Sequence, residues 1–163
     1  VWEGTKDFIN HMPPNSQRGF KVALADVASP KDDQAYREGY EKIVETLKMM
    51  KEKGIFIVPG TDLGGSFFYH RELELYQQLG YTPAELLKLA TYDMAQYLGD
   101  ENLGSLEPGK LADFFLIPGN PLEDIKAIKT ISMVSRGGTF YYPSEVYPAF
   151  GILPFTPKPE VEE

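Results

Sequence analysis

The residues with the clearest chemical potential lie in a short stretch between an apolar run and a helix. The run at 55–58, Ile-Phe-Ile-Val, is followed by Pro-Gly-Thr-Asp-Leu-Gly-Gly at 59–65. A carboxylate just past the carboxyl end of a buried strand stands where parallel α/β folds place their chemistry. Asp62 is therefore the main catalytic candidate. On local sequence alone, an aspartate of a turn or a helix cap is the favoured interpretation, and the surrounding motifs favour the catalytic one.

Four neighbours of Asp62 are candidates for binding substrate. Thr61 would orient Asp62, and Gly64 and Gly65 would let a ligand approach the backbone or would supply positive φ. His70 would line the pocket from the start of the next helix. Each has a structural alternative, as loop residues or as a packed histidine. We expect His11 to be a loop residue, and Glu72 and Glu74 to belong to a solvated helix face.

Composition excludes several classes of function. The chain has 163 residues, with 16 basic and 24 acidic side chains and a net charge of −8. It has no lysine and arginine cluster, so we expect no nucleic-acid partner and no anionic membrane partner. No apolar run is long enough to cross a bilayer. The chain contains no cysteine and only two histidines, which excludes thiolate sites and an all-histidine metal site within it. A lack of cysteine fits any compartment, so localisation stays open.

The elements that must position Asp62 follow from periodicity and caps. Ser29 and Pro30 predict the start of an amphipathic helix over 30–53. The run at 55–58 does not alternate, which is typical of a strand buried on both faces of a parallel sheet. Further helices are predicted at 69–79 and, after the capping box that opens at Thr82, at 83–98. Short strands are expected at 20–27, 111–117, 130–135 and 139–142, the last two forming a hairpin at Gly137-Gly138.

Several motifs occur together in one order along the chain. They are Gly60-Thr61-Asp62, His70-x-Glu72-Leu73, Thr91 with Ala95, the stretch Gly-Ser-Leu-Glu-Pro-Gly-Lys-Leu-Ala-Asp at 104–113, and Asn120-Pro121-Leu122. In this order the chain resembles the amidohydrolase superfamily of metal-dependent hydrolases, most closely its imidazolonepropionase and prolidase-like branch. The resemblance runs from about residue 54 to residue 142.

The resemblance implies an α/β fold: the C-terminal fragment of a (β/α)₈ TIM-like barrel plus part of a small β-sandwich. Residues 1–103 would belong to the barrel, with 55–58 as its eighth strand. Residues 104–142 would supply the C-terminal strands of the sandwich, and 143–163 would form a proline-rich acidic tail. The family aspartate that Asp62 matches binds a divalent metal, with zinc expected, and takes a proton from the attacking water.

The other metal ligands of this family, a His-x-His pair and two later histidines among them, have no match in these residues. We therefore expect a C-terminal part of a longer hydrolase of amide, cyclic amide or peptide C–N bonds. Its partners would be the missing N-terminal part of the same protein and a small-molecule or dipeptide-like substrate. This chain alone is expected to be inactive, to hold no metal and to form homo-oligomers. The alternatives are a non-catalytic α/β association module and a hydrolase of another bond, such as an ester.

Overall fold

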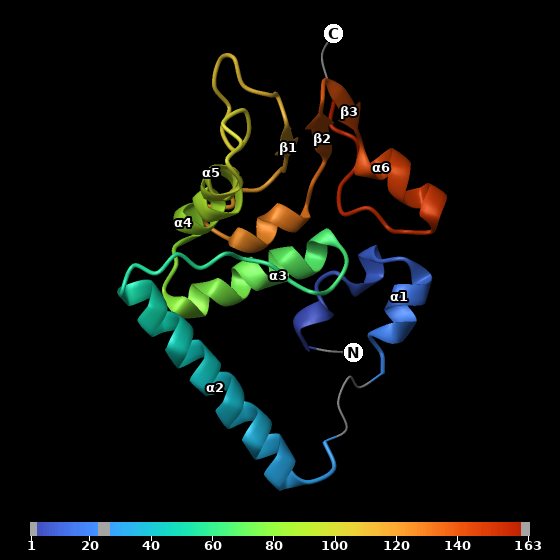
Figure 1. Ribbon diagram of the computed structural model, residues 1–163. Helices are drawn as coiled ribbons and strands as arrows, with labels where there is room; N and C mark the ends of the chain where they lie inside the picture. Colours follow the sequence, from blue (N-terminus) through green and yellow to red (C-terminus); the bar gives the residue numbers. More distant parts are fainter. Residues whose placement is uncertain (1–2, 23–26, 161–163) are drawn as a thin grey trace.

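A computed structural model describes residues 3–22 and 27–160 (Figure 1). Half of the predicted strand at 20–27, residues 23–26, lies outside the described residues, and the described half forms no strand. The helices are α1 (Pro14–Gly19), α2 (Pro30–Glu52), α3 (Ser66–Tyr76), α4 (Pro83–Lys88), α5 (Met94–Leu98) and α6 (Pro143–Val146). The strands are β1 (Phe114–Leu116), β2 (Met133–Arg136) and β3 (Thr139–Tyr141). Single 3₁₀ turns occur at Glu3–Thr5, Ile9–His11, Gln77–Leu79, Ile125–Lys129 and Tyr147–Phe150. In Figure 1, α3 crosses the middle of the molecule and α2 runs along its edge.

Helix α2 begins as the sequence predicts. The Ser29 side chain accepts a hydrogen bond from the backbone N–H of Asp32, and Pro30 occupies the first turn. The helix has 23 residues, none of them buried. Its apolar side chains nevertheless lie on one face, and that face meets the rest of the molecule near Gln77–Leu79 and the core beside it.

The helices after Asp62 confirm the predictions for 69–79 and 83–98, except that the first begins three residues earlier and the second contains one irregularity. Helix α3 begins at Ser66, directly after Gly65, whose φ of 106° disfavours other residues. The capping box of Thr82 and Glu85 opens α4. A π-helical turn at Leu89–Asp93 then joins α4 to α5. The helix therefore continues through this segment with one widened turn.

The prediction of a strand buried on both faces at 55–58 is wrong. The segment is extended but carries no strand hydrogen bonds to any described residue. Ile57 is 8% exposed, whereas Phe56 is 49% exposed. A strand exists only through pairing with a neighbour, and the described residues offer no strand beside this segment. Its apolar side chains are therefore not covered by neighbouring strands, as those of a buried strand would be.

The C-terminal strands form a three-stranded antiparallel sheet in the order β1-β2-β3. Ser135 pairs with Phe114 on one side and with Phe140 on the other. The predicted hairpin is confirmed, because Gly137 and Gly138 both have positive φ, at 54° and 79°, as a tight hairpin turn requires. The strands are shorter than predicted, and the outer edges of β1 and β3 are unpaired among the described residues.

Two hydrophobic clusters hold these parts together. The larger joins Ile57 to α3, α4 and the 3₁₀ turn at Ile125–Lys129. The smaller contains aromatic residues of the N-terminal segment and of the first turn of α3. The tail contributes Phe155, which packs against Phe67 and stacks on His11. The described part of the tail therefore lies against the N-terminal segment, and both flank the helix that follows Asp62.

Candidate functional site

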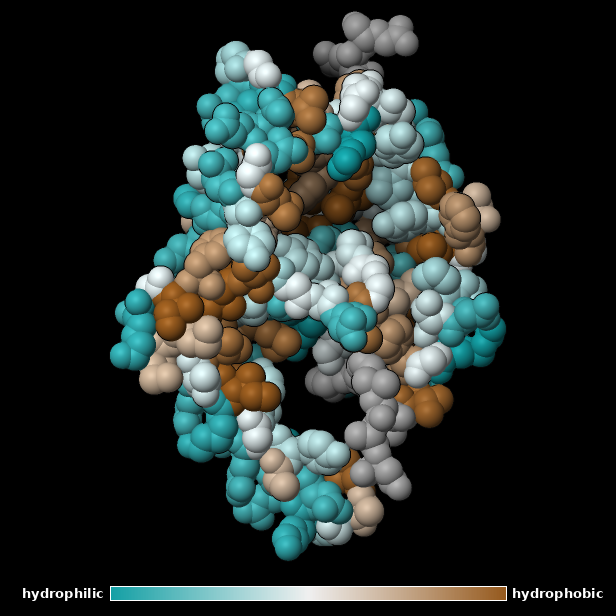
Figure 2. All heavy atoms as spheres, in the orientation of Figure 1, coloured by the Kyte–Doolittle hydropathy of each residue, from teal (hydrophilic) through white to brown (hydrophobic). Residues whose placement is uncertain are grey.

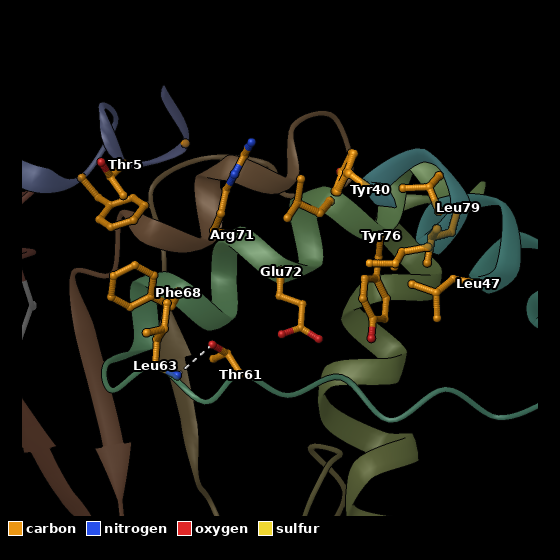
Figure 3. A pocket seen from close by; sticks show the side chains of 15 residues that line it. Thr5, Tyr40, Leu47, Thr61, Leu63, Phe68, Arg71, Glu72, Tyr76 and Leu79 are labelled. Carbon is orange, nitrogen blue, oxygen red and sulfur yellow. Dashed lines mark hydrogen bonds between the residues drawn. The ribbon is translucent and has the colours of Figure 1, made fainter. Parts of the chain in front are cut away.

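The loop at 59–65 is held at both ends. Near its start, the backbone N–H of Gly60 donates to Glu72 Oε1 at 2.9 Å. In its middle, Thr61 Oγ1 accepts a hydrogen bond from the N–H of Leu63 at 3.1 Å (Figure 3). At its end, Gly65 leads directly into α3. Thr61, Asp62, Gly64 and Gly65 thus lie on one short exposed loop, as the sequence predicts for neighbours, and only Gly65 of the two glycines has positive φ.

Asp62 is exposed, and its carboxylate has no hydrogen bond or ion pair within the part of the chain that the structure describes. A metal ion in a catalytic site needs about three protein ligands. Among residues 3–22 and 27–160, no three His, Cys, Asp or Glu side chains lie close enough to hold one. The donor set present here therefore does not fit a metal by itself. It offers one open carboxylate.

A cavity of about 460 Å³ lies beside the loop. It is enclosed by α2, α3, the N-terminal segment and the side chains of Thr61 and Leu63 (Figure 3). Most of its lining is apolar: it includes Tyr40, Ile43, Val44 and Leu47 of α2 and Phe68, Leu75, Tyr76 and Leu79 of α3 and its 3₁₀ extension. Figure 2 shows the molecule hollowed next to α2, with hydrophobic side chains on one side of the opening. The polar groups among its lining residues include Arg71 and Glu72.

His70 does not line this cavity. It is buried, and its Nδ1 has no hydrogen-bond partner among the described residues. Burial lowers the pKa of His70 to about 4, and the positive charge of Lys129 contributes to the decrease. The side chain is therefore neutral at physiological pH. A substrate-binding role for His70 stays a prediction.

The expectation that Glu74 belongs to a solvated helix face is wrong. Its side chain is 3% exposed and pairs with the equally buried Lys129 of the 3₁₀ turn at Ile125–Lys129. Arg71 Nη1 also contacts Glu74, at 2.7 Å. Asp7 of the N-terminal segment lies 3.8 Å from the Lys129 ammonium. This buried network joins three parts of the chain. No local pattern around Lys129 could have indicated it, because its partner lies 55 residues away.

Glu72 is the residue of the loop site that sequence reasoning missed. It was expected on the same solvated face, yet it is half-buried and turned toward the loop (Figure 3). It lies 12 residues from Gly60, a separation that carries no signal without the fold. The residue type was the one available indication. A glutamate in the second turn of a helix that follows a glycine-rich loop is able to accept hydrogen bonds from backbone N–H groups of that loop.

No helix in the described residues combines the length and apolar character needed to cross a membrane.

The chain was compared with a set of protein-family models, with curated proteins and with solved structures. Residues 15–140 match the Amidohydrolase family. No curated protein matches the chain. Among solved structures, a Xaa-Pro dipeptidase with methionine bound in its active site is 32% identical, with a TM-score of 0.57, over 61% of this chain and 25% of that one. A putative prolidase from Bifidobacterium longum is 38% identical, with a TM-score of 0.56, over 60% of this chain and 26% of that one. A further amidohydrolase is 26% identical, with a TM-score of 0.54, over 77% of this chain and 31% of that one.

The chain thus spans about a quarter to a third of the length of the solved structures that it matches. The family match covers α2, the loop of Asp62, α3 to α5 and most of the three-stranded sheet. It covers most of the chain, and the structural neighbours agree with it. On this evidence the chain belongs to the amidohydrolase family.

Proposed function

We propose that this chain is the C-terminal part of a hydrolase that cleaves an amide, cyclic amide or peptide C–N bond, with Asp62 as its general base. The observation that carries the proposal is the open carboxylate of Asp62, on a loop held at both ends, in a chain of the amidohydrolase family. A carboxylate that is free of other partners is available to accept a proton from a water attacking a carbonyl. As general base, it would supply roughly 10²–10⁴-fold in rate.

The proposal includes the arrangement expected from the sequence. Residues 1–103 would belong to a (β/α)₈ barrel, 104–142 to the sandwich beside it, and 143–163 to the tail. The apolar cavity beside α2 and the unpaired segment at 55–58 support this arrangement, because both suit contact with further β-structure. The N-terminal part of the same protein would supply that structure.

Family members use divalent metals, and zinc is the metal we expect in the complete protein. Asp62 would be one ligand. Because the described residues do not build a metal site by themselves, the other ligands would come from outside the described residues, and we propose the N-terminal part of the same protein as their source. We assign no step of the reaction to the metal from the present residues.

For the substrate, we propose a dipeptide-like molecule. The support is the resemblance to a Xaa-Pro dipeptidase and to a putative prolidase, at 32% and 38% identity. The test is hydrolysis by the natural gene product that contains this chain. Xaa-Pro dipeptides should be cleaved, with N-acylated amino acids and p-nitrophenyl esters assayed in parallel. Cleavage of the esters alone would replace the C–N assignment with ester hydrolysis.

A second candidate function, non-catalytic association, is favoured by the apolar cavity and the exposed side chains of Ile55, Phe56 and Val58. Unpaired extended backbone with apolar side chains promotes pairing between chains. On either function we expect the isolated chain to form dimers or larger homo-oligomers. Multi-angle light scattering checks this expectation, and a monodisperse species of 18.3 kDa at high concentration would contradict it. Retention of natural partners by a gene product with no hydrolase activity would favour association.

A further inference from the structure

We infer that Glu72 is a positioning residue for Asp62: it fixes the start of the loop at 59–65 and thereby fixes where the Asp62 carboxylate stands. The inference rests on the proposed function in so far as Asp62 takes part in a reaction. The hydrogen bond itself, from the Gly60 N–H to Glu72 Oε1 at 2.9 Å, is a feature of the fold. A backbone N–H that donates to an ionised carboxylate forms one of the stronger hydrogen bonds in proteins.

The loop needs an anchor of this kind because Asp62 provides none. Its own side chain makes no hydrogen bond or ion pair with any described residue. The direction of the carboxylate is therefore set by the backbone at 60–62 alone. The other hydrogen bond of the loop, from Leu63 N–H to Thr61 Oγ1, shapes the turn but does not tie it to the body of the molecule. Among the described residues, Glu72 is the side chain that joins the start of the loop to a helix.

Glu72 has a buried neighbour on the same helix. Tyr76, one turn further along α3, is buried and lies beside Glu72 (Figure 3). Burial raises the pKa of the Tyr76 phenol and the adjacent Glu72 carboxylate raises it further, so the phenol stays protonated beside that carboxylate. Leu73, beside Glu72 in sequence, is 2% exposed in the main hydrophobic cluster. The anchor therefore stands on a helix that packs into the main hydrophobic cluster.

Glu72 borders the apolar cavity, but its contacts favour a role in positioning the loop over a role in binding a ligand there. Figure 3 shows its side chain directed from α3 toward the strand-like segment that carries Thr61. The carboxylate accepts the Gly60 N–H and lies beside the Tyr76 phenol. A ligand in the cavity would have to compete with the Gly60 hydrogen bond to use it. Positioning of the loop is the role that these contacts support.

The first experiment measures amide hydrogen exchange in this chain by NMR. In Glu72→Leu, which keeps bulk and helix propensity but accepts no hydrogen bond, exchange of the Gly60 amide should become about tenfold faster or more. Amides of α3, such as that of Leu73, should exchange at the wild-type rate. Glu72→Gln retains a side-chain oxygen and should restore slow exchange at Gly60. Glu41→Gln, at an exposed glutamate of α2, is the matched control and should change nothing.

Tyr76→Phe provides a second variant should Glu72→Leu fail to fold. It keeps the buried ring and removes only the hydroxyl beside the Glu72 carboxylate, and should speed Gly60 exchange about threefold, a smaller effect than that of direct removal. Unchanged exchange at Gly60 in both variants would overturn the anchor. Exchange that rises equally throughout α3 would overturn it as well, because that pattern is general destabilisation.

The second experiment measures steady-state kinetics of the natural gene product that contains this chain. Glu72→Leu should lower kcat about tenfold or more with little change in KM, and Glu72→Gln should restore most of it. Loss of turnover in Asp62→Asn with wild-type kcat in Glu72→Leu would overturn the positioning role and leave the proposed function standing. Wild-type turnover in Asp62→Asn would instead refute the proposed function, whatever the exchange data show.

Discussion

Replacing Asp62 with asparagine in the natural gene product should abolish most turnover and leave the fold intact. Asp62 is exposed and makes no hydrogen bond or ion pair with the described residues, so the substitution removes no stabilising contact. We expect the free energy of unfolding to change by less than about 0.5 kcal/mol, as for other surface positions. Asparagine has nearly the same size and keeps the loop geometry.

The loss in rate follows from the lost proton acceptor. A neutral amide cannot take a proton from the attacking water, and general-base catalysis typically contributes about 10²–10⁴-fold. This corresponds to about 3–5 kcal/mol of activation free energy. The substitution should thus raise the activation free energy by several times as much as it changes the free energy of unfolding. That separation distinguishes a catalytic aspartate from one that merely shapes a turn.

Asp113 provides the internal control, because its carboxylate has the contacts that Asp62 lacks. Asp113 Oδ1 accepts a hydrogen bond from the Gly137 N–H at 2.8 Å. Its ion pair with Arg136, at 3.4 Å, contributes little because the arginine side chain is 75% exposed. Asp113→Asn keeps an oxygen for Gly137, so we expect a loss of about 1 kcal/mol in stability and wild-type turnover per folded molecule.

The assay is turnover at saturating divalent metal, with circular dichroism and urea unfolding of the same preparations. Asp62→Asn should unfold at the wild-type urea concentration while turnover falls by two orders of magnitude or more. If Asp62→Asn keeps more than about a tenth of wild-type turnover, the rate effect lies below the range of a general base. Asp62 would then be a turn residue and the assignment of the site would be wrong.

Three further predictions concern the chain by itself. Equilibrium dialysis against zinc should show no stoichiometric binding, because the described residues hold no cluster of three ligands, and one tightly bound zinc per chain would contradict this. Burial and Lys129 hold the pKa of His70 at about 4 against 6.5 in the unfolded chain, so the unfolded state binds more protons between these values. Urea unfolding at a series of pH values should therefore show stability lost as pH falls from 6.5 to 4, by up to about 3 kcal/mol more than in His70→Phe. Lys129→Met should cost about 2 kcal/mol in urea unfolding, because it leaves the buried Glu74 carboxylate with Arg71 as its remaining cation among the described residues. Lys126→Met, at an exposed lysine, should cost under about 1 kcal/mol.

What the sequence predicted well was set by interactions within a few residues. The start of α2 depends on Ser29 and Asp32, three residues apart, and the start of α4 on Thr82 and Glu85 at the same spacing. The hairpin depends on two adjacent glycines that tolerate positive φ. These contacts form in any context, so local pattern was enough to place them, and the same holds for the loop that carries Asp62.

What the sequence did not predict depends on partners far along the chain or outside it. Glu72 and Glu74 share one helix with exposed residues, and nothing nearby shows that one reaches Gly60 and the other Lys129. The run at 55–58 presents the opposite case. Its composition is that of a strand with neighbours on both sides, and the described residues provide none, so it stays extended with Phe56 half exposed. Apolar side chains are stabilised by burial, so the exposure of this apolar segment supports our proposal that further β-structure lies beside it in the complete protein. Asp62 would then act at the carboxyl end of the strand that this segment forms there.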